Sequence, residues 1–118
     1  MNRYCVYQNY TIKEVIERID ASKNRVVIVL NRNQKVIGVI SQGDIIRALI
    51  ADKNLYAQID SIIRPNFIYL NEKDMEKAFY LFKKRNITLL PIVDEEFSLL
   101  DVISMDDIYK YMEEICRK

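Results

Sequence analysis

Residues 39–45 read Val-Ile-Ser-Gln-Gly-Asp-Ile, and residues 102–108 read Val-Ile-Ser-Met-Asp-Asp-Ile. The two stretches lie 63 residues apart and share five of their seven residues. At the same offset, without a gap, the apolar positions of residues 12–30 fall on apolar positions of residues 75–93. A shared pattern of this length indicates that the chain repeats one structural unit. We expect the first repeat at about 3–54, a connecting segment at 55–65 and the second repeat at about 66–117.

Each repeat has the pattern of a strand, a helix, two strands and a second helix. In the first repeat, Thr11 and Glu14 have the spacing of a capping box, which predicts a helix from there to about Asp20. The remaining elements of this repeat are predicted as strands at 4–7, 26–30 and 35–40 and a helix at 43–51. The second repeat is predicted to form strands at 67–70, 88–93 and 98–103 and helices at 74–84 and 105–115. The connecting segment 55–64 is predicted to be a short helix ended by Pro65.

These elements predict the α+β class. Neither repeat is large enough to bury its own apolar faces, so we expect the two β-α-β-β-α repeats to pack about a pseudo-twofold axis. Residues 1–118 would then form a single module.

The composition argues against most enzyme classes. The 118 residues include no histidine and only two glycines. The chain therefore lacks the usual general base near neutral pH, the commonest zinc ligand and any glycine-rich phosphate loop. We expect no catalytic residues, no metal site and no cofactor. The 18 basic and 17 acidic residues give a net charge of +1, which also argues against a nucleic-acid binder.

The sequence does not predict membrane insertion or a disulfide scaffold. Its apolar runs reach about five residues, far short of the roughly 20 that span a bilayer. With only two cysteines, Cys5 and Cys116, a reducing, cytoplasmic location is expected. Each cysteine is predicted to be a small buried apolar residue, and the alternative is a disulfide that joins the two ends of the chain.

Both copies of the Ser-x-x-Asp pattern lie where a predicted strand meets a predicted helix. Ser41 and Asp44 form the first copy, and Ser104 and Asp107 form the second. As a helix cap, the serine hydroxyl would accept a hydrogen bond from a first-turn N–H, and the aspartate would complement the positive helix end. As a ligand site, the N–H groups and the hydroxyl would bind a phosphate, and the carboxylate would accept hydrogen bonds from a ribose. The spacing is compatible with both interpretations.

With these motifs, and with residues 87–94 reading Ile-Thr-Leu-Leu-Pro-Ile-Val-Asp, the chain resembles a tandem pair of cystathionine-β-synthase (CBS) domains, a Bateman module. The resemblance covers essentially the whole chain. It implies a regulatory module that binds adenosine nucleotides (AMP, ADP or ATP) in two clefts between the repeats and associates as a disc-like homodimer. Residues 41–47 are most similar to pairs fused to sugar-phosphate nucleotidyltransferases, a similarity carried by Gly43 and Arg47.

The family pattern also implies which residues contact the ligand. In one cleft the ribose phosphate would lie against Ser41 and Asp44, near Arg47, and the base against Cys5 and Ile28. In the other cleft the corresponding residues would be Ser104 and Asp107, with the base against Ile68, Thr88 and Leu90.

The two repeats depart from each other at several of these positions. Gly38 is matched by Asp101, Gly43 by Asp106, and Ile28 by Pro91. Residues 1–59 contain nine basic and five acidic residues, a charge of +4, whereas residues 60–118 contain nine and twelve, a charge of −3. We therefore expect the Ser41–Asp44 cleft to be the better phosphate site, and the other to be weak or to prefer an uncharged nucleoside. The alternative is that these charges are only solvated surface.

The leading interpretation is a non-catalytic sensor of adenine nucleotides that modulates an attached or associated effector. The alternative is a structural dimerisation module in which both Ser-x-x-Asp motifs are only helix caps. Ile108, Tyr109, Met112 and Ile115 form an apolar stripe on the last predicted helix, which predicts either a core face or a dimer interface.

Overall fold

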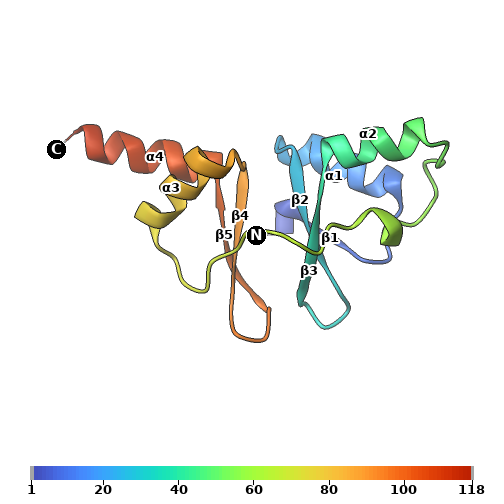
Figure 1. Cartoon of the computed structure of the whole chain (residues 1–118), viewed down its shortest axis with the longest axis horizontal. Helices are drawn as coiled ribbons and strands as arrows, with labels where there is room; N and C mark the ends of the chain where they lie inside the picture. The colour runs from blue at the N-terminus through green and yellow to red at the C-terminus, as the bar shows by residue number, and fades with distance from the viewer. Residues whose placement is uncertain (1, 118) are drawn as a thin grey trace. The chain divides into compact units, whose positions relative to one another are not determined.

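The computed structural model describes residues 2–117. The chain divides into two compact units, one that ends at Phe67 and one that begins at Ile68. The first unit contains η1 (Asn2–Tyr4), β1 (Cys5–Tyr7), α1 (Ile12–Ser22), β2 (Val26–Leu30), β3 (Val36–Ser41), α2 (Gln42–Ile50) and η2 (Asp60–Ile62). The second contains α3 (Met75–Arg85), β4 (Leu89–Val93), β5 (Leu99–Ser104) and α4 (Met105–Cys116). Each unit combines helices with a small sheet, which confirms the α+β class (Figure 1).

The sheet of the first unit has the order β1-β2-β3. β1 runs parallel to β2, with Cys5 opposite Ile28, and β2 runs antiparallel to β3. Successive residues of a strand point to opposite faces. Val27 and Val29 accordingly share one face of β2 and pack in the same core cluster as Ile12 of α1 and Ile45 of α2.

The second unit lacks one of its predicted strands. In place of a strand at 67–70, Leu70 forms an isolated parallel bridge to Ile92. The amide of Leu70 donates to the carbonyl of Pro91, and the amide of Val93 donates to the carbonyl of Leu70. The preceding hydrogen bond of such a ladder would run from residue 91 to the carbonyl of Ile68, but proline has no N–H to donate. The pairing therefore stops at Leu70, and the sheet consists of β4 and β5 alone.

The same local structures recur at the offset of 63 residues. The side chain of Asn31 accepts hydrogen bonds from the amides of residues 33 and 35, and that of Asp94 accepts them from residues 96 and 98. Left-handed backbone occurs at Lys23 and Asn86 and again at Gln34 and Phe97, and the two hairpins carry a register shift at Val29/Leu30 and at Ile92/Val93. The repeat is therefore present in backbone conformation even where the residue types differ.

The connecting segment is not the helix that the sequence predicts. Its only helical part is the three-residue 3-10 turn η2. The carbonyls of Leu55 and Ala57 accept hydrogen bonds from the amides of Lys13 and Ile12, at 2.8 and 2.9 Å. First-turn amides of a helix have no partner within that helix. The segment thus supplies acceptors for the start of α1 instead of forming a helix of its own.

The end of this segment lies against β3. Arg64 and Val39 exchange two backbone hydrogen bonds, of 2.9 and 3.0 Å. This approach requires a glycine at 38, because a Cβ there would lie 2.5 Å from both the Arg64 carbonyl oxygen and Cγ2 of Ile63. The contact brings the side chain of Arg64 to the start of α2.

The two cysteines differ in exposure. Cys5 is buried, as predicted, whereas Cys116 is exposed at the end of α4, so the prediction that Cys116 is buried was wrong; neither cysteine forms a disulfide. The stripe on α4 is likewise divided, because Ile108 is buried but Tyr109, Met112 and Ile115 are exposed. Among the described residues, no helix is both long and apolar enough to cross a membrane.

Candidate functional site: two Ser-x-x-Asp motifs with different partners

The first motif lies at the junction of β3 and α2. Ser41 is the last residue of β3 and has extended backbone, and its hydroxyl accepts a hydrogen bond of 3.1 Å from the amide of Asp44. In return, Oδ2 of Asp44 accepts from the amide of Ser41 at 2.8 Å and from its hydroxyl at 2.9 Å. The motif is therefore a complete capping box, and the capping interpretation is confirmed for this repeat.

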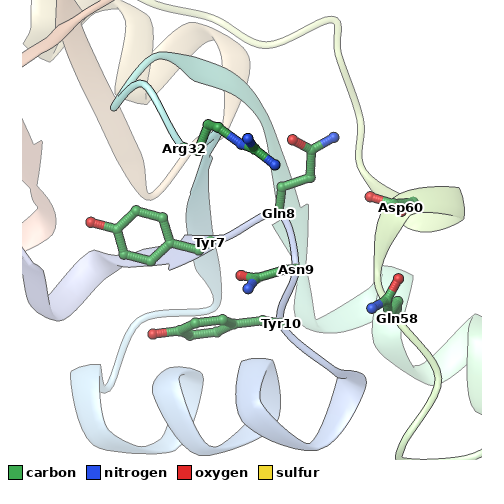
Figure 2. Close-up of a pocket in the computed structure, with 7 residues that line it drawn as sticks. All are labelled: Tyr7, Gln8, Asn9, Tyr10, Arg32, Gln58 and Asp60. Atoms are coloured by element: carbon green, nitrogen blue, oxygen red, sulfur yellow. The ribbon is translucent and has the colours of Figure 1, made fainter.

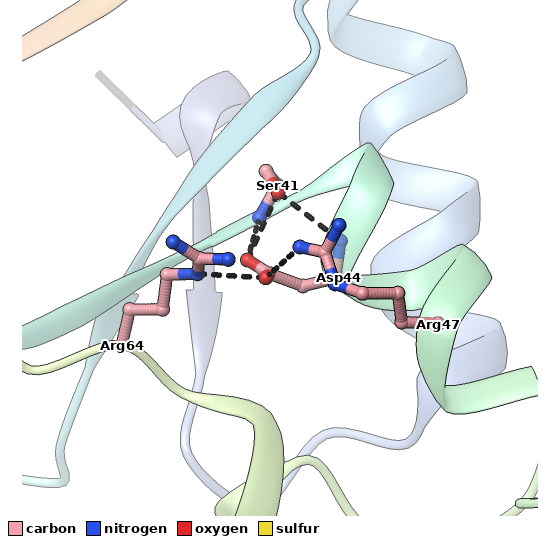
Figure 3. A network of polar contacts seen from close by, with 4 residues as sticks. All are labelled: Ser41, Asp44, Arg47 and Arg64. Atoms are coloured by element: carbon pink, nitrogen blue, oxygen red, sulfur yellow. Dashed lines mark hydrogen bonds and ion pairs between the residues drawn. The ribbon is translucent and has the colours of Figure 1, made fainter. Parts of the chain in front are cut away.

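Two arginines hold the other oxygen of Asp44 (Figure 3). Nη2 of Arg47 and Nε of Arg64 each lie 2.7 Å from Oδ1. Burial alone raises the pKa of Asp44, but hydrogen bonds from the Ser41 backbone, from Arg47, from Arg64 and from the Ser41 hydroxyl together hold it below its ordinary value. The carboxylate is thus charged and locked in place at neutral pH.

Asp44 has no acceptor capacity left. A carboxylate offers about four lone-pair positions, and Asp44 accepts four hydrogen bonds while only 7% exposed. A ribose hydroxyl could bind it only by displacing one of these donors. By contrast, Arg47 and Arg64 have side chains that are 62% and 57% exposed, so the accessible part of this site is cationic.

The second motif has the same cap but no arginines. Oδ2 of Asp107 accepts from the amide and the hydroxyl of Ser104 at 2.9 and 3.1 Å, and the Asp107 amide lies 3.4 Å from that hydroxyl. Oδ1 of Asp107 has no hydrogen-bond donor within residues 2–117. The position of Arg47 is taken by Lys110, which makes no ion pair with any described residue.

The strand residues expected to contact a base are buried or half-buried. Cys5 and Ile28 are register partners and are 5% and 0% exposed. Burial raises the pKa of the Cys5 thiol. In the second unit, Leu90 is 0% exposed and lies in the core cluster with Phe82, against which Ile68 packs, whereas Thr88 is half-buried just before β4. The side chains of Ile28 and Leu90 therefore have no surface to offer a ligand.

Arg64 is the member of the first site that the sequence did not predict. It lies 20 residues from Asp44, on the connecting segment. No local pattern relates the two residues, and the only sequence signal was Gly38, which allows the segment to approach β3. Among the described residues, no cluster of three or more metal-ligating side chains occurs.

Comparison with known proteins agrees with the repeat. The family model for the CBS domain matches residues 1–51 and 59–114. The magnesium transporter MgtE of Thermus thermophilus is 27% identical over 114 residues, which cover 92% of this chain but only 24% of the transporter. The chain thus spans about a quarter of this relative's length.

Two solved structures show the same fold. One is a protein from Thermotoga maritima with a CBS domain pair and an ACT domain; its TM-score is 0.77 at 25% identity, over 94% of this chain and 88% of that one. The other is a CBS domain protein from Pyrobaculum aerophilum, solved in complex with AMP; its TM-score is 0.72 at 19% identity, over 93% and 90% of the two chains. With the family model matched once in each repeat, the chain belongs to the CBS domain family, as a tandem pair of CBS domains.

Proposed function

We propose that the chain is a regulatory module that binds adenosine ligands at its two Ser-x-x-Asp motifs, with AMP or ATP preferred at the first. The observation that carries the proposal is the open acceptor at Asp107, whose Oδ1 receives no hydrogen bond within residues 2–117 although its other oxygen is fixed by Ser104. A fixed carboxylate with one open oxygen suits the hydroxyls of a ribose. The AMP bound to the Pyrobaculum aerophilum protein supports this class of ligand.

The two motifs would differ in what they prefer. Each guanidinium has five N–H donors, and Arg47 and Arg64 each use one on Asp44. The remaining donors are exposed and can bind phosphate. The first motif is therefore the phosphate-preferring site, whereas the motif of Ser104 and Asp107 suits an uncharged nucleoside.

The adenine would contact backbone rather than side chains at the strands. Ile28 and Leu90 are fully buried, so only their peptide groups could pair with a base. Cys5 is 5% exposed, so it too would contact a base mainly through its peptide group. Ile68 and Thr88 are half-buried and would supply side-chain contact in the second unit.

Calorimetric titration of the whole chain with adenosine, AMP and ATP tests this assignment. Asp107→Asn should weaken adenosine binding about tenfold, as loss of one charge-assisted hydrogen bond would. The double variant Arg47→Gln/Arg64→Gln should weaken AMP and ATP but leave adenosine unchanged. Lys53→Gln/Lys83→Gln, which removes the same charge elsewhere, is the control. Absence of any thermal shift with millimolar AMP, ADP, ATP, S-adenosylmethionine or NAD would contradict nucleotide binding.

A second candidate function is homodimerisation, which the exposed apolar side chains of α2 and α4 favour. Ile46 and Tyr109 occupy equivalent positions and are 52% and 55% exposed, and Leu49 and Met112 are 37% and 39% exposed. Apolar side chains repeated at one face of both helices are typical of a protein interface. Light scattering should report a dimer, and Ile46→Glu with Tyr109→Glu should give a monomer that still folds.

The effector would be a separate domain or protein. The transporter relative is about four times longer than the matched region, so its CBS pair is one part of a larger molecule. A ligand changes such an effector only by binding one state of the module more tightly than another. We propose a cytoplasmic setting, since neither cysteine forms a disulfide. The effector, with a sugar-phosphate nucleotidyltransferase among the candidates, stays a prediction.

A further inference from the structure

The first unit has a cavity of about 550 Å³ that belongs to neither Ser-x-x-Asp motif (Figure 2). It is lined by the segment after β1, by the β2–β3 turn and by the connecting segment. Ser41 pairs with Val26 at the opposite end of the β2–β3 hairpin from this turn. The volume falls within the roughly 300–1,000 Å³ usual for small-molecule sites.

The walls of this cavity are held by backbone hydrogen bonds. The amide of Gln8 donates to the Leu30 carbonyl at 2.9 Å, and the amide of Ile59 donates to the Tyr10 carbonyl at 3.2 Å. The β2–β3 turn is ordered by the side chain of Asn31, which accepts two backbone hydrogen bonds. The backbones of three segments that are distant in sequence are thus fixed to one another around a half-open pocket, in which the side chains of Gln8, Arg32 and Asp60 are exposed.

Two opposite charges line the cavity without pairing. Arg32 comes from the hairpin turn and Asp60 from η2. Neither side chain forms an ion pair or hydrogen bond with any described residue. In Figure 2 the side chain of Gln8 lies between them. A ligand that spans the cavity would meet a cation at one side and an anion at the other.

Aromatic surface completes the lining. The rings of Tyr7 and Tyr10 lie 5.9 Å apart at 59°, and both point to the same side of the cavity in Figure 2. The hydroxyl of Tyr7 donates to the side chain of Gln34 at 3.0 Å, which fixes this ring. Tyrosine faces accept apolar groups and cations.

We propose that this cavity binds a small zwitterion of the amino acid or dipeptide class. The guanidinium of Arg32 would hold the carboxylate through two N–H groups, and Asp60 would accept from the ammonium group. The tyrosine rings would contact the ligand's side chain. The site is independent of the nucleotide motifs, so the module would sense two kinds of ligand.

NMR titration of the whole ¹⁵N-labelled chain with L-phenylalanine and with glycyl-L-phenylalanine tests the proposal. The two charges of L-phenylalanine are adjacent, whereas a peptide group separates those of glycyl-L-phenylalanine. Binding of either probe supports the site, and the probe that binds more tightly indicates which charge separation the site prefers. The amides of Gln8, Asn9, Arg32 and Asp60 should shift. Phenylacetate and phenethylamine, which each lack one of the two charges, should bind at least tenfold more weakly.

Substitutions provide the decisive comparison. Arg32→Gln and Asp60→Asn should each weaken zwitterion binding at least tenfold, whereas Lys53→Gln and Asp20→Asn should not. The proposal is overturned if neither probe shifts these amides at tens of millimolar, if both site variants bind as well as the wild type, or if the single-charge analogues bind equally well. The ¹⁵N spectra of the same variants show that they remain folded, and titration of these variants with AMP tests whether the nucleotide site is separate.

Discussion

Asp44 and Asp107 occupy the same position in the two repeats but have different partners. Both cap a helix through the serine three residues earlier. Only Asp44 also holds two guanidinium groups, each at 2.7 Å. The same motif is therefore closed in the first repeat, where Arg47 and Arg64 hold the second oxygen of Asp44, and open in the second.

The stability that Asp44 provides should depend on pH. Its pKa in the folded chain lies below the ordinary value, so the unfolded chain binds a proton first as the pH falls. The contribution is then fully present above about pH 5 and decreases as the pH passes through about 4 and below. Urea unfolding of the wild type and of Asp44→Asn between pH 7 and pH 3 measures it. The difference between their free energies of unfolding should shrink at low pH, and a constant difference would contradict the prediction.

At the scale of elements, the connecting segment is positioned by one glycine. Gly38 allows residues 63 and 64 to lie directly against β3, and this contact delivers Arg64 to Asp44. The equivalent position in β5 is Asp101, which instead pairs with Lys73 at 3.5 Å. A short backbone approach in one repeat thus creates the electrostatic difference between the two motifs.

The two glycines of the chain should respond oppositely to alanine. A Cβ at 38 would meet backbone and Cγ2 atoms at 2.5 Å, so Gly38→Ala should cost about 1–3 kcal/mol of the free energy of unfolding. A Cβ at 43 would meet only the movable end of the Arg47 side chain, at 3.2 Å. Gly43→Ala, within α2, should be neutral or stabilising by up to about 1 kcal/mol. Chemical denaturation of both variants distinguishes them, and equal effects would count against a close approach at Gly38.

Pro91 should be what limits the second sheet. Pro91→Ala restores an N–H that can donate to the carbonyl of Ile68, extending the pairing that now stops at Leu70. The new amide at 91 should then be protected from hydrogen exchange. Pro65→Ala, at an exposed position, adds an amide without a comparable acceptor and serves as the reference. An amide at 91 that exchanges as fast as the one at 65 would show that the missing strand has another cause.

At the scale of the whole molecule, the sequence predicted what depends on near neighbours. The capping boxes at Thr11, Ser41 and Ser104 were predictable because every partner lies three residues away. The predictions that failed concern residues whose hydrogen-bond partners are distant in the sequence. The segment 55–64 supplies carbonyls to the start of α1 instead of forming the predicted helix, and Arg64 could not be assigned to Asp44 from any local pattern.

Only the local part of the candidate site was predictable from the sequence. The four motif residues lie where the sequence placed them, and the ligand they bind stays a prediction. Leu90 is an example. At the offset of 63 residues it aligns with Val27, and both side chains lie in a core cluster, so the alignment of the repeats already indicated that Leu90 faces the core. A family pattern names such positions without saying which face of the strand they occupy.

The two units should differ in stability when separated. Residues 1–67 keep a three-stranded sheet together with the connecting segment that satisfies the start of α1, whereas residues 68–118 keep a sheet of two strands. Two strands alone are marginal in water, and both pieces are shorter than the roughly 70–80 residues at which a single core suffices. We expect 1–67 to show a cooperative but weakened urea transition by circular dichroism, and 68–118 to show none. The prediction is contradicted if 68–118 unfolds cooperatively at the same urea concentration as 1–67. The third strand and the connecting segment would then add nothing to the stability of the first unit, and the two repeats would differ only in their charges.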